Sequence, residues 1–205
     1  IIYPNTWKLT QKDKQYFYQD RQCKIKLNTK NVYSKGMFEN VCLAIKVALD
    51  LNIDKKVIQK ALPLLSFEGR FQYLNKGKIK NKLNRNEFIM IDGAHATADA
   101  QNLASYLKKI KIPKYGIWAM TKNKEPDLFI KQLKGVFKKI ITMPIDNEVN
   151  SVSAQELYKV ATENKFNVEK SDNFAQALKK ISSKEKKLIV CFGSLYNCGN
   201  ILNKN

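Results

Sequence analysis

A regular alternation of strand-like and helical stretches, from about residue 85 to the end, limits the fold of this chain more than any other feature of its sequence. Short apolar runs predict strands, and apolar residues recurring every three or four positions predict helices. The predicted strands are 70–74, 87–91, 115–120, 139–143, 167–169 and 188–192, and the predicted helices are 97–110, 126–137, 153–164, 173–181 and a last one after residue 194. This alternation is typical of βαβ units around a mostly parallel sheet with helices on both faces. We therefore predict a doubly wound α/β domain over residues 69–205.

Residues 1–68 have a different character, and we interpret them as the tail of another element whose beginning is missing. Side-chain patterns predict strands at 15–18 and 23–27. Apolar residues at three- and four-residue steps predict an amphipathic helix from Met37 to Leu51. A second helix is expected from Asp54 to Leu65, with Asp54 as its N-cap.

The composition indicates a folded protein with a core. Of the 205 residues, 44% are hydrophobic, which is enough to form one. No apolar stretch approaches the roughly 20 residues that span a bilayer, and the first residues do not resemble a signal peptide. The four cysteines form no C-x-x-C pair, which argues against zinc and for a reduced, cytoplasmic protein.

The formal net charge of +19 raises the possibility of nucleic-acid binding, because Lys and Arg neutralise phosphate. Only Arg21, Arg70 and Arg85 are arginines, although arginine is better suited to bidentate phosphate contacts. The lysines are scattered over all the predicted helices. The abundance of Lys, Asn and Ile favours codon bias over a nucleic-acid function, which remains the weaker alternative.

Three polar segments follow predicted strands, where doubly wound folds place their ligands. The first contains Asp92 and the single histidine, His95; the second is residues 119–125; the third runs through Gly193 and Ser194 into the last helix. Ser194 can cap that helix and, with its free N–H groups, hold an anion. A histidine merely packed at a strand end is the alternative for His95.

Arg70 lies at the junction of the two regions, where its guanidinium can reach a phosphate or form a surface ion pair. The sequence contains no G-x-x-x-x-G-K-[ST] phosphate loop, no G-x-G-x-x-G and no G-x-S-x-G nucleophile elbow. A Ser–His–Asp system that pairs Ser194 with His95 is therefore disfavoured.

Four segments together resemble the Mur-ligase superfamily and, within it, the folylpolyglutamate synthase/dihydrofolate synthase family. That family has a W-P-G-R-F-like segment, a strand ending in D-G-A-H-N, a G-M-x-x-D-K-D-like turn and a G-S-L-Y-x-x-G segment. The matching stretches here are F-E-G-R-F at 67–71, D-G-A-H-A at 92–96, A-M-T-K-N-K-E at 119–125 and G-S-L-Y-N-C-G at 193–199. The resemblance implies a Rossmann-like Mur-ligase C-terminal domain, with residues 1–68 as the C-terminal remnant of a central ATPase domain.

The resemblance also implies an activity, in which an ATP-dependent ligase joins L-glutamate to folate through an acyl phosphate. It assigns Asn40, Arg70 and Asp92 to ATP, Ser194 to glutamate and His95 to the reaction cleft. The magnesium ligands and the phosphate loop are expected in an N-terminal region that this sequence lacks, so we expect the chain alone to be inactive or nearly so.

Several positions depart from the family pattern. Gly36 and Met37 replace a His-Gln pair upstream of Asn40, while Glu68, Ala96 and Asn123 replace proline, asparagine and aspartate. These departures leave open a non-catalytic remnant or one half of a split enzyme, with the N-terminal half as a separate partner.

Overall fold

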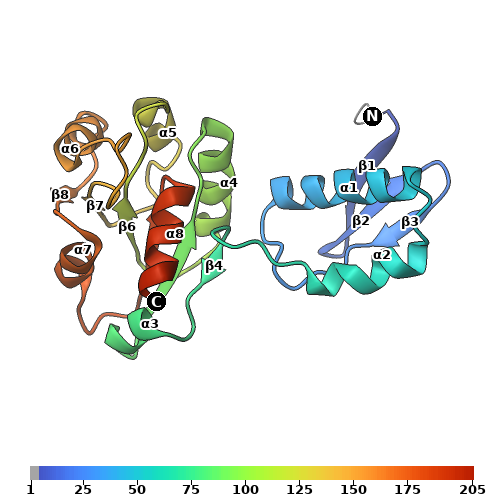
Figure 1. Cartoon of the computed structure of the whole chain (residues 1–205), viewed down its shortest axis with the longest axis horizontal. Helices are drawn as coiled ribbons and strands as arrows, with labels where there is room; N and C mark the ends of the chain where they lie inside the picture. Colours follow the sequence, from blue (N-terminus) through green and yellow to red (C-terminus); the bar gives the residue numbers. More distant parts are fainter. Residues whose placement is uncertain (1–4) are drawn as a thin grey trace. The chain divides into compact units, whose positions relative to one another are not determined.

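The computed structural model describes residues 5–205, and the chain divides into two compact units between Phe67 and Glu68 (Figure 1). The first unit combines an antiparallel sheet with two helices. Its elements are β1 (Trp7–Lys12), β2 (Gln15–Asp20), β3 (Lys24–Lys26), α1 (Lys35–Asp50), α2 (Lys55–Ala61) and a 3₁₀ helix (Leu62–Leu64).

A tight hairpin starts the first unit. Asp13 and Lys14 join β1 to β2 with φ angles of 47° and 62°. Two consecutive positive φ angles are the requirement of a type I′ turn, whose twist matches that of the paired strands. The sheet order is β1-β2-β3, and α1 packs against β1 and β2.

Helix α1 begins at Ser34, whose side-chain oxygen accepts from the Met37 N–H at 3.2 Å. The helix buries Phe38, Cys42 and Ile45 in the core of this unit. Their spacing places them on one side of the helix, facing Tyr18 and Ile25 of the sheet among other core residues.

The second unit is a six-stranded sheet covered by helices. Its elements are β4 (Gln72–Tyr73), α3 (Lys78–Lys82), β5 (Glu87–Asp92), α4 (Thr97–Lys108), β6 (Lys114–Trp118), α5 (Pro126–Lys131), β7 (Lys139–Thr142), α6 (Ala154–Glu163), β8 (Val168–Lys170), α7 (Phe174–Ile181), β9 (Lys187–Phe192) and α8 (Leu195–Lys204).

The strand order, β4-β5-β9-β6-β7-β8, confirms the predicted doubly wound domain. All neighbouring strands are parallel except β4, which pairs antiparallel with β5. The chain moves outward through β6, β7 and β8 and then returns to insert β9 beside β5. Because right-handed crossovers in opposite directions lie on opposite faces, α4, α5 and α6 cover one face and α7 covers the other (Figure 1).

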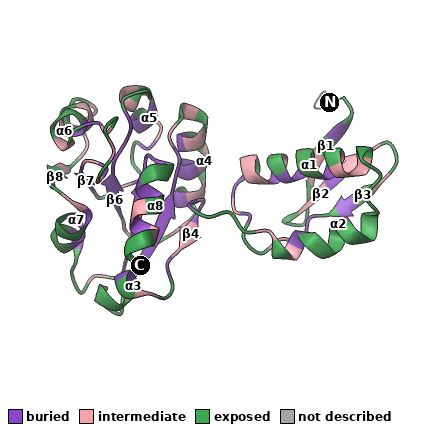
Figure 2. Ribbon diagram, viewed as in Figure 1, coloured by how far each residue is buried: buried purple, intermediate pink, exposed green. Residues whose placement is uncertain are grey.

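The strands of this sheet are mostly buried (Figure 2), and each face of the sheet packs its own apolar layer. Ile117 and Cys191 belong to the core that contains α7 and α8 residues such as Leu178 and Ile201. The adjacent positions on the strands point the other way. There Trp118 and Phe192 stack on each other and on Phe129 of α5, with ring centroids 6.1–6.4 Å apart.

The structure differs from the sequence-based expectation in several elements. Strand β1 was not predicted, α3 was not predicted, and the strand expected at 70–74 is reduced to the two residues of β4. The helix expected to reach Leu65 stops at Ala61, where Pro63 and its neighbours form the 3₁₀ turn. No helix among residues 5–205 is both long and apolar enough to cross a membrane.

Candidate functional site

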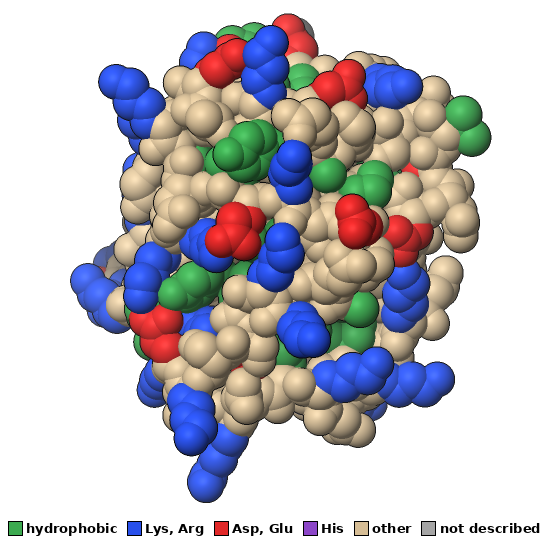
Figure 3. All heavy atoms as spheres, turned by 90° about the vertical axis from the view of Figure 1, so that its left-hand side faces the viewer, with side chains coloured by type: hydrophobic (Ala, Val, Ile, Leu, Met, Phe, Trp, Pro, Cys, Tyr) green, Lys and Arg blue, Asp and Glu red, His purple; other side chains and the backbone are tan. Residues whose placement is uncertain are grey.

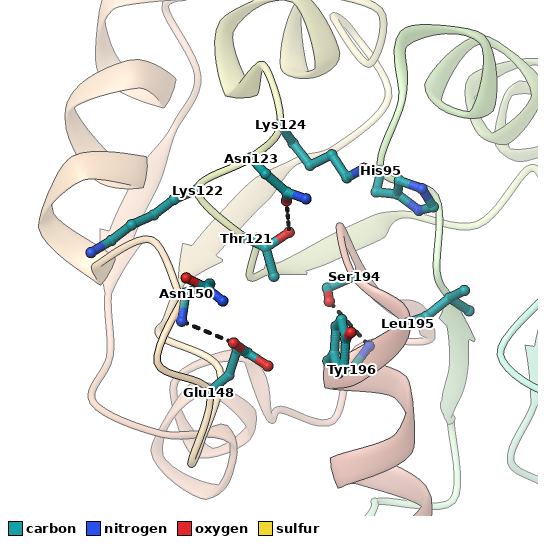
Figure 4. A pocket seen from close by; sticks show the side chains of 10 residues that line it. All are labelled: His95, Thr121, Lys122, Asn123, Lys124, Glu148, Asn150, Ser194, Leu195 and Tyr196. Carbon is teal, nitrogen blue, oxygen red and sulfur yellow. Dashed lines mark hydrogen bonds between the residues drawn. The ribbon is translucent and has the colours of Figure 1, made fainter.

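A cleft of about 680 Å³ opens at the carboxyl ends of the parallel strands in the second unit (Figure 4). The turns after β5, β6, β7 and β9 all contribute to it. Its lining residues are His95, Thr121, Lys122, Asn123, Lys124, Glu148, Asn150, Ser194, Leu195 and Tyr196. Two of the predicted site residues, His95 and Ser194, therefore share one cleft.

His95 is held by the backbone of its own turn. Its Nδ1 lies 2.7 Å from the Gly93 carbonyl oxygen. Because a carbonyl only accepts, Nδ1 carries the proton, and in the neutral ring Nε2 is left as an acceptor. The side chain is 28% exposed, and it also lines an adjoining hollow of about 470 Å³ with Asn123 and Lys124.

Helix α4, which follows this turn, has an incomplete cap. The Asp99 Oδ2 atom accepts from the N–H groups of His95 and Ala96 at 3.2 and 3.3 Å. Ala96 occupies the N-cap position with an extended backbone, and its methyl group cannot accept from the first helical turn. Ala96 therefore leaves the first turn of α4 without a side-chain cap.

Asp92 is buried behind the cleft and is not among its lining residues. Its Oδ2 accepts from the Phe71 N–H and its Oδ1 accepts from the Ala94 N–H, both at 2.8 Å. Burial raises the pKa of Asp92 to about 6, although those two N–H groups and the charge of Arg70 act in the opposite direction. Asp92 therefore ties the segment entering the unit to the turn that holds His95.

Arg70 and Asn40 lie outside the cleft lining. Arg70 is half-buried, and its charge acts on Asp92. Asn40 is exposed on α1 of the first unit. The structure thus brings His95 and Ser194 together in the cleft, leaves Arg70 and Asp92 outside its lining, and has Asn40 in the other unit.

The turn after β6 supplies two lysines that the sequence-based site did not include. Thr121 Oγ1 donates to Asn123 Oδ1 at 2.8 Å, which stiffens the turn. Lys124 extends across the mouth of the cleft toward His95, whereas Lys122 points away (Figure 4). The polar run at 119–125 predicts this turn from the sequence. It does not show which of the two lysines faces the cleft.

The loop after β7 also lines the cleft and was missed entirely. It is anchored by backbone bonds, with the Lys122 N–H donating to the Asn150 oxygen and the Val152 N–H donating to the Met120 oxygen, both at 2.8 Å. Glu148 lies on this loop and accepts from the Asn150 N–H at 2.9 Å. The sequence of this loop has no distinctive pattern, so only the fold reveals its part in the site.

The turn after β9 requires glycine for steric reasons. Gly193 has a φ of 106°, and a Cβ there would lie 2.3 Å from the Ala119 carbonyl oxygen. The chain then enters α8 at Ser194, whose Oγ accepts from the Tyr196 N–H at 3.1 Å. The positive end of α8 therefore faces the cleft, as expected for an anion site.

Charge is dispersed on the face of the molecule that Figure 3 shows. One face of the molecule shows lysines and arginines spread among acidic side chains, not gathered in a single patch (Figure 3). Over residues 5–205 there is no group of three or more His, Cys, Asp or Glu side chains placed to hold a metal ion.

The fold and cleft define a class of protein: a doubly wound α/β domain with a cleft at the carboxyl ends of its strands, where folds of this class bind their ligands. The profile of the family described as dihydrofolate synthetase, C-terminal domain, matches residues 75–204. The chain belongs to this family. A search of curated protein sequences finds no match.

Solved structures share the fold. Escherichia coli FolC in complex with ADP has a TM-score of 0.76 at 18% identity, over 98% of this chain and 46% of that one. Mycobacterium tuberculosis folylpolyglutamate synthase complexed with ADP and AMPPCP has a TM-score of 0.77 at 16% identity, over 92% and 44%. The bifunctional folylpolyglutamate synthase/dihydrofolate synthase of Yersinia pestis, complexed with AMPPNP and Mn ion, has a TM-score of 0.76 at 16% identity, over 98% and 46%. This chain spans about half the length of these relatives.

Proposed function

We propose that this chain is the C-terminal part of an ATP-dependent ligase that joins L-glutamate to folate, and that its cleft holds the glutamate. The family match and the basic cleft at the strand ends support the proposal. The observation that carries it is the convergence of Lys124, His95 and the start of α8 at Ser194 on one hollow.

The cleft offers a partner for each charged group of glutamate. Lys124 and the N-terminal end of α8 attract carboxylates, and the Ser194 hydroxyl can donate to one of them. Glu148 supplies the opposite charge for the ammonium group. A dicarboxylic amino acid therefore fits the distribution of charge better than a neutral one.

His95 is assigned to proton transfer. Joining glutamate requires its amine to attack the carbonyl carbon of an acyl phosphate, so that a C–N bond forms and phosphate leaves with the C–O bonding pair. The ammonium group must first lose a proton, and after the C–N bond forms the nitrogen loses a second proton, which the departing phosphate can accept. With Nδ1–H donated to the Gly93 oxygen, the Nε2 lone pair of His95 is the acceptor available in the cleft.

Asn40, Arg70 and Asp92 are proposed to serve ATP, which would supply the phosphoryl group. Arg70 can contact phosphate directly, because it is only half-buried. Both oxygens of Asp92 already accept from backbone N–H groups, so we assign it to holding the turn near the nucleotide. The described residues do not make a magnesium site by themselves, and no step is assigned to that ion.

The first experiment measures L-glutamate binding by calorimetry with the whole chain. We expect wild-type binding that Lys124→Gln weakens about tenfold, the scale of one charge-assisted contact. Lys134→Gln, at an exposed lysine outside the cleft lining, is the matched control. If wild-type chain does not bind glutamate, the assignment of the cleft is wrong.

The second experiment tests catalysis. The chain is mixed with a separately expressed N-terminal half, ATP, Mg²⁺, folate and radiolabelled L-glutamate. Product that forms only in the mixture supports a split ligase. Glutamate binding without product in any combination favours the alternative, a non-catalytic remnant, which the replacements at Ala96 and Asn123 motivate.

A further inference from the structure

The loop after β7 contains two successive β-turns that share Glu148. The Glu148 N–H donates to the Ile145 oxygen at 3.3 Å, and the Ser151 N–H donates to the Glu148 oxygen at 3.0 Å. In the first turn Asn147 has a φ of 58°, as a type II turn requires of its third residue. The peptide that joins Asp146 to Asn147 therefore has a particular orientation, which sets the direction in which the chain continues to Glu148.

Side chains of the last helix hold that peptide. Asn200 of α8 donates from Nδ2 to the Asp146 backbone oxygen at 2.7 Å, and Lys204 forms an ion pair with the Asp146 carboxylate. Because Tyr196, Asn200 and Lys204 follow one another at steps of four, they lie on one side of α8. The Lys204 side chain is 50% exposed, so its ion pair contributes little. The hydrogen bond of the half-buried Asn200 is the stronger of the two contacts.

The residue that this turn directs is an acid of the cleft. Glu148 lines one side of the cleft, and the start of α8 lines another (Figure 4). Its Oε1 accepts from the Asn150 N–H at 2.9 Å, and it forms no ion pair with any residue of 5–205. A carboxylate that can still accept hydrogen bonds suits the ammonium group of a ligand.

We propose that Asn200 is a positioning residue that makes the cleft select an amino dicarboxylate over the same dicarboxylate without an ammonium group. This inference rests on the proposed function, in which Glu148 binds the ammonium group of L-glutamate. Asn200 does not line the cleft; it acts by holding the Asp146 peptide and thereby keeping Glu148 in place. Glutarate, which is L-glutamate without the ammonium group, gains nothing from Glu148. Loss of the Asn200 amide therefore weakens the binding of L-glutamate alone.

The experiment compares the two ligands by calorimetry with the whole chain. Wild type should bind L-glutamate at least about tenfold more tightly than glutarate, the scale of one charge-assisted contact. Asn200→Ala should reduce this preference to about twofold by weakening L-glutamate binding. Alanine favours a helix, so α8 and the fold should survive. Asn203→Ala, the same change at an exposed residue of α8, is the matched control.

Two further measurements distinguish positioning from a merely structural role. Glu148→Gln should abolish the preference, and adding Asn200→Ala to it should then change the preference less than about twofold. Hydrogen exchange without ligand should be about tenfold faster in Asn200→Ala than in Asn203→Ala at the N–H groups of Glu148 and Ser151. Thermal melting verifies that all the variants are folded.

Three results overturn the inference: a preference that Asn200→Ala leaves unchanged, an equal loss of affinity for both ligands, or an effect of Asn200→Ala on the preference that persists at full size in Glu148→Gln. Failure of the proposed function gives a different result. Wild type then binds neither ligand, which removes the selectivity as well, even where faster exchange shows that Asn200 holds the turn.

Discussion

Substituting Asp92 should change how the stability of the second unit depends on pH. Burial raises the pKa of this carboxyl from 3.8 to about 6. An acid whose pKa is higher in the folded chain than in the unfolded chain stabilises the fold when it is protonated. This contribution is complete below the pKa of the unfolded chain and is lost as the pH rises through the pKa of the folded chain. The difference of about two pH units corresponds to about 3 kcal/mol, of which about 2 kcal/mol is lost between pH 4 and pH 7.

Asp92→Asn removes that titration and keeps the shape of the side chain. The amide oxygen can accept from only one of the two N–H groups, of Phe71 or Ala94, and the amide NH₂ then faces the other. This mismatch destabilises the variant by about 1–3 kcal/mol at low pH. Near pH 7 the variant avoids burying a charge, so the two proteins should become nearly equal in stability.

The assay is urea unfolding of both whole chains from pH 4 to pH 7.5, at constant ionic strength. Asp172→Asn is the control, because Asp172 is an exposed carboxyl in the same unit. The stability of wild type minus that of Asp92→Asn should fall by about 2 kcal/mol across the range. A constant difference would refute the reasoning, as would an Asp92 pKa near 4 measured by NMR.

Four further substitutions test particular contacts. Ala96→Asn should stabilise the chain by about 0.5–2 kcal/mol, because the new side chain caps α4; an unchanged melting temperature would contradict this. Lys187→Met should destabilise it by about 3 kcal/mol in urea unfolding, since Lys187 and Glu87 are buried partners with Nζ and Oε1 3.6 Å apart. The double variant with Glu87→Gln should lose less than the sum of the single losses, and strict additivity would show that the pair is not coupled. Gly193→Ala should lose about 2–4 kcal/mol, because its Cβ would meet the Ala119 oxygen at 2.3 Å; a loss below 1 kcal/mol would mean that the turn adjusts freely.

The predicted sheet was recoverable from the sequence because its strands are buried on both faces. Such strands appear in the sequence as continuous apolar runs, as in Ile89–Ile91 and Leu188–Phe192, and the helices between them carry a clear apolar stripe. The elements that were missed are short or lie at an edge. Strand β1 is recognisable only through its pairing with β2, and α3 has five residues, too few to show a helical period.

The site was harder to predict, because its position depends on which strands are neighbours. Strand order brings Ser194, from the end of the chain, beside the turn of His95, about a hundred residues earlier. Glu148 and Asn150 reach the cleft because their loop pairs through backbone hydrogen bonds with the turn after β6. Such bonds do not depend on residue type, so the sequence does not predict them. The sequence predicts that Asp92 faces a ligand. Its hydrogen bonds to backbone N–H groups depend on packing, so only the structure reveals them.

The way these loops are anchored bears on whether the cleft is still functional. Backbone bonds hold the cleft together: the Gly93 N–H donates to the Gly69 oxygen, and the Lys122 and Val152 N–H groups pair the turns after β6 and β7. The departures from the family pattern at Ala96 and Asn123 concern side chains, and none of these backbone bonds depends on them. It follows that a folded cleft is no evidence of catalysis in this chain, and that binding and turnover can be lost separately. Glutamate binding that depends on Lys124 tests the cleft as a binding site, and product formation with an N-terminal half tests catalysis.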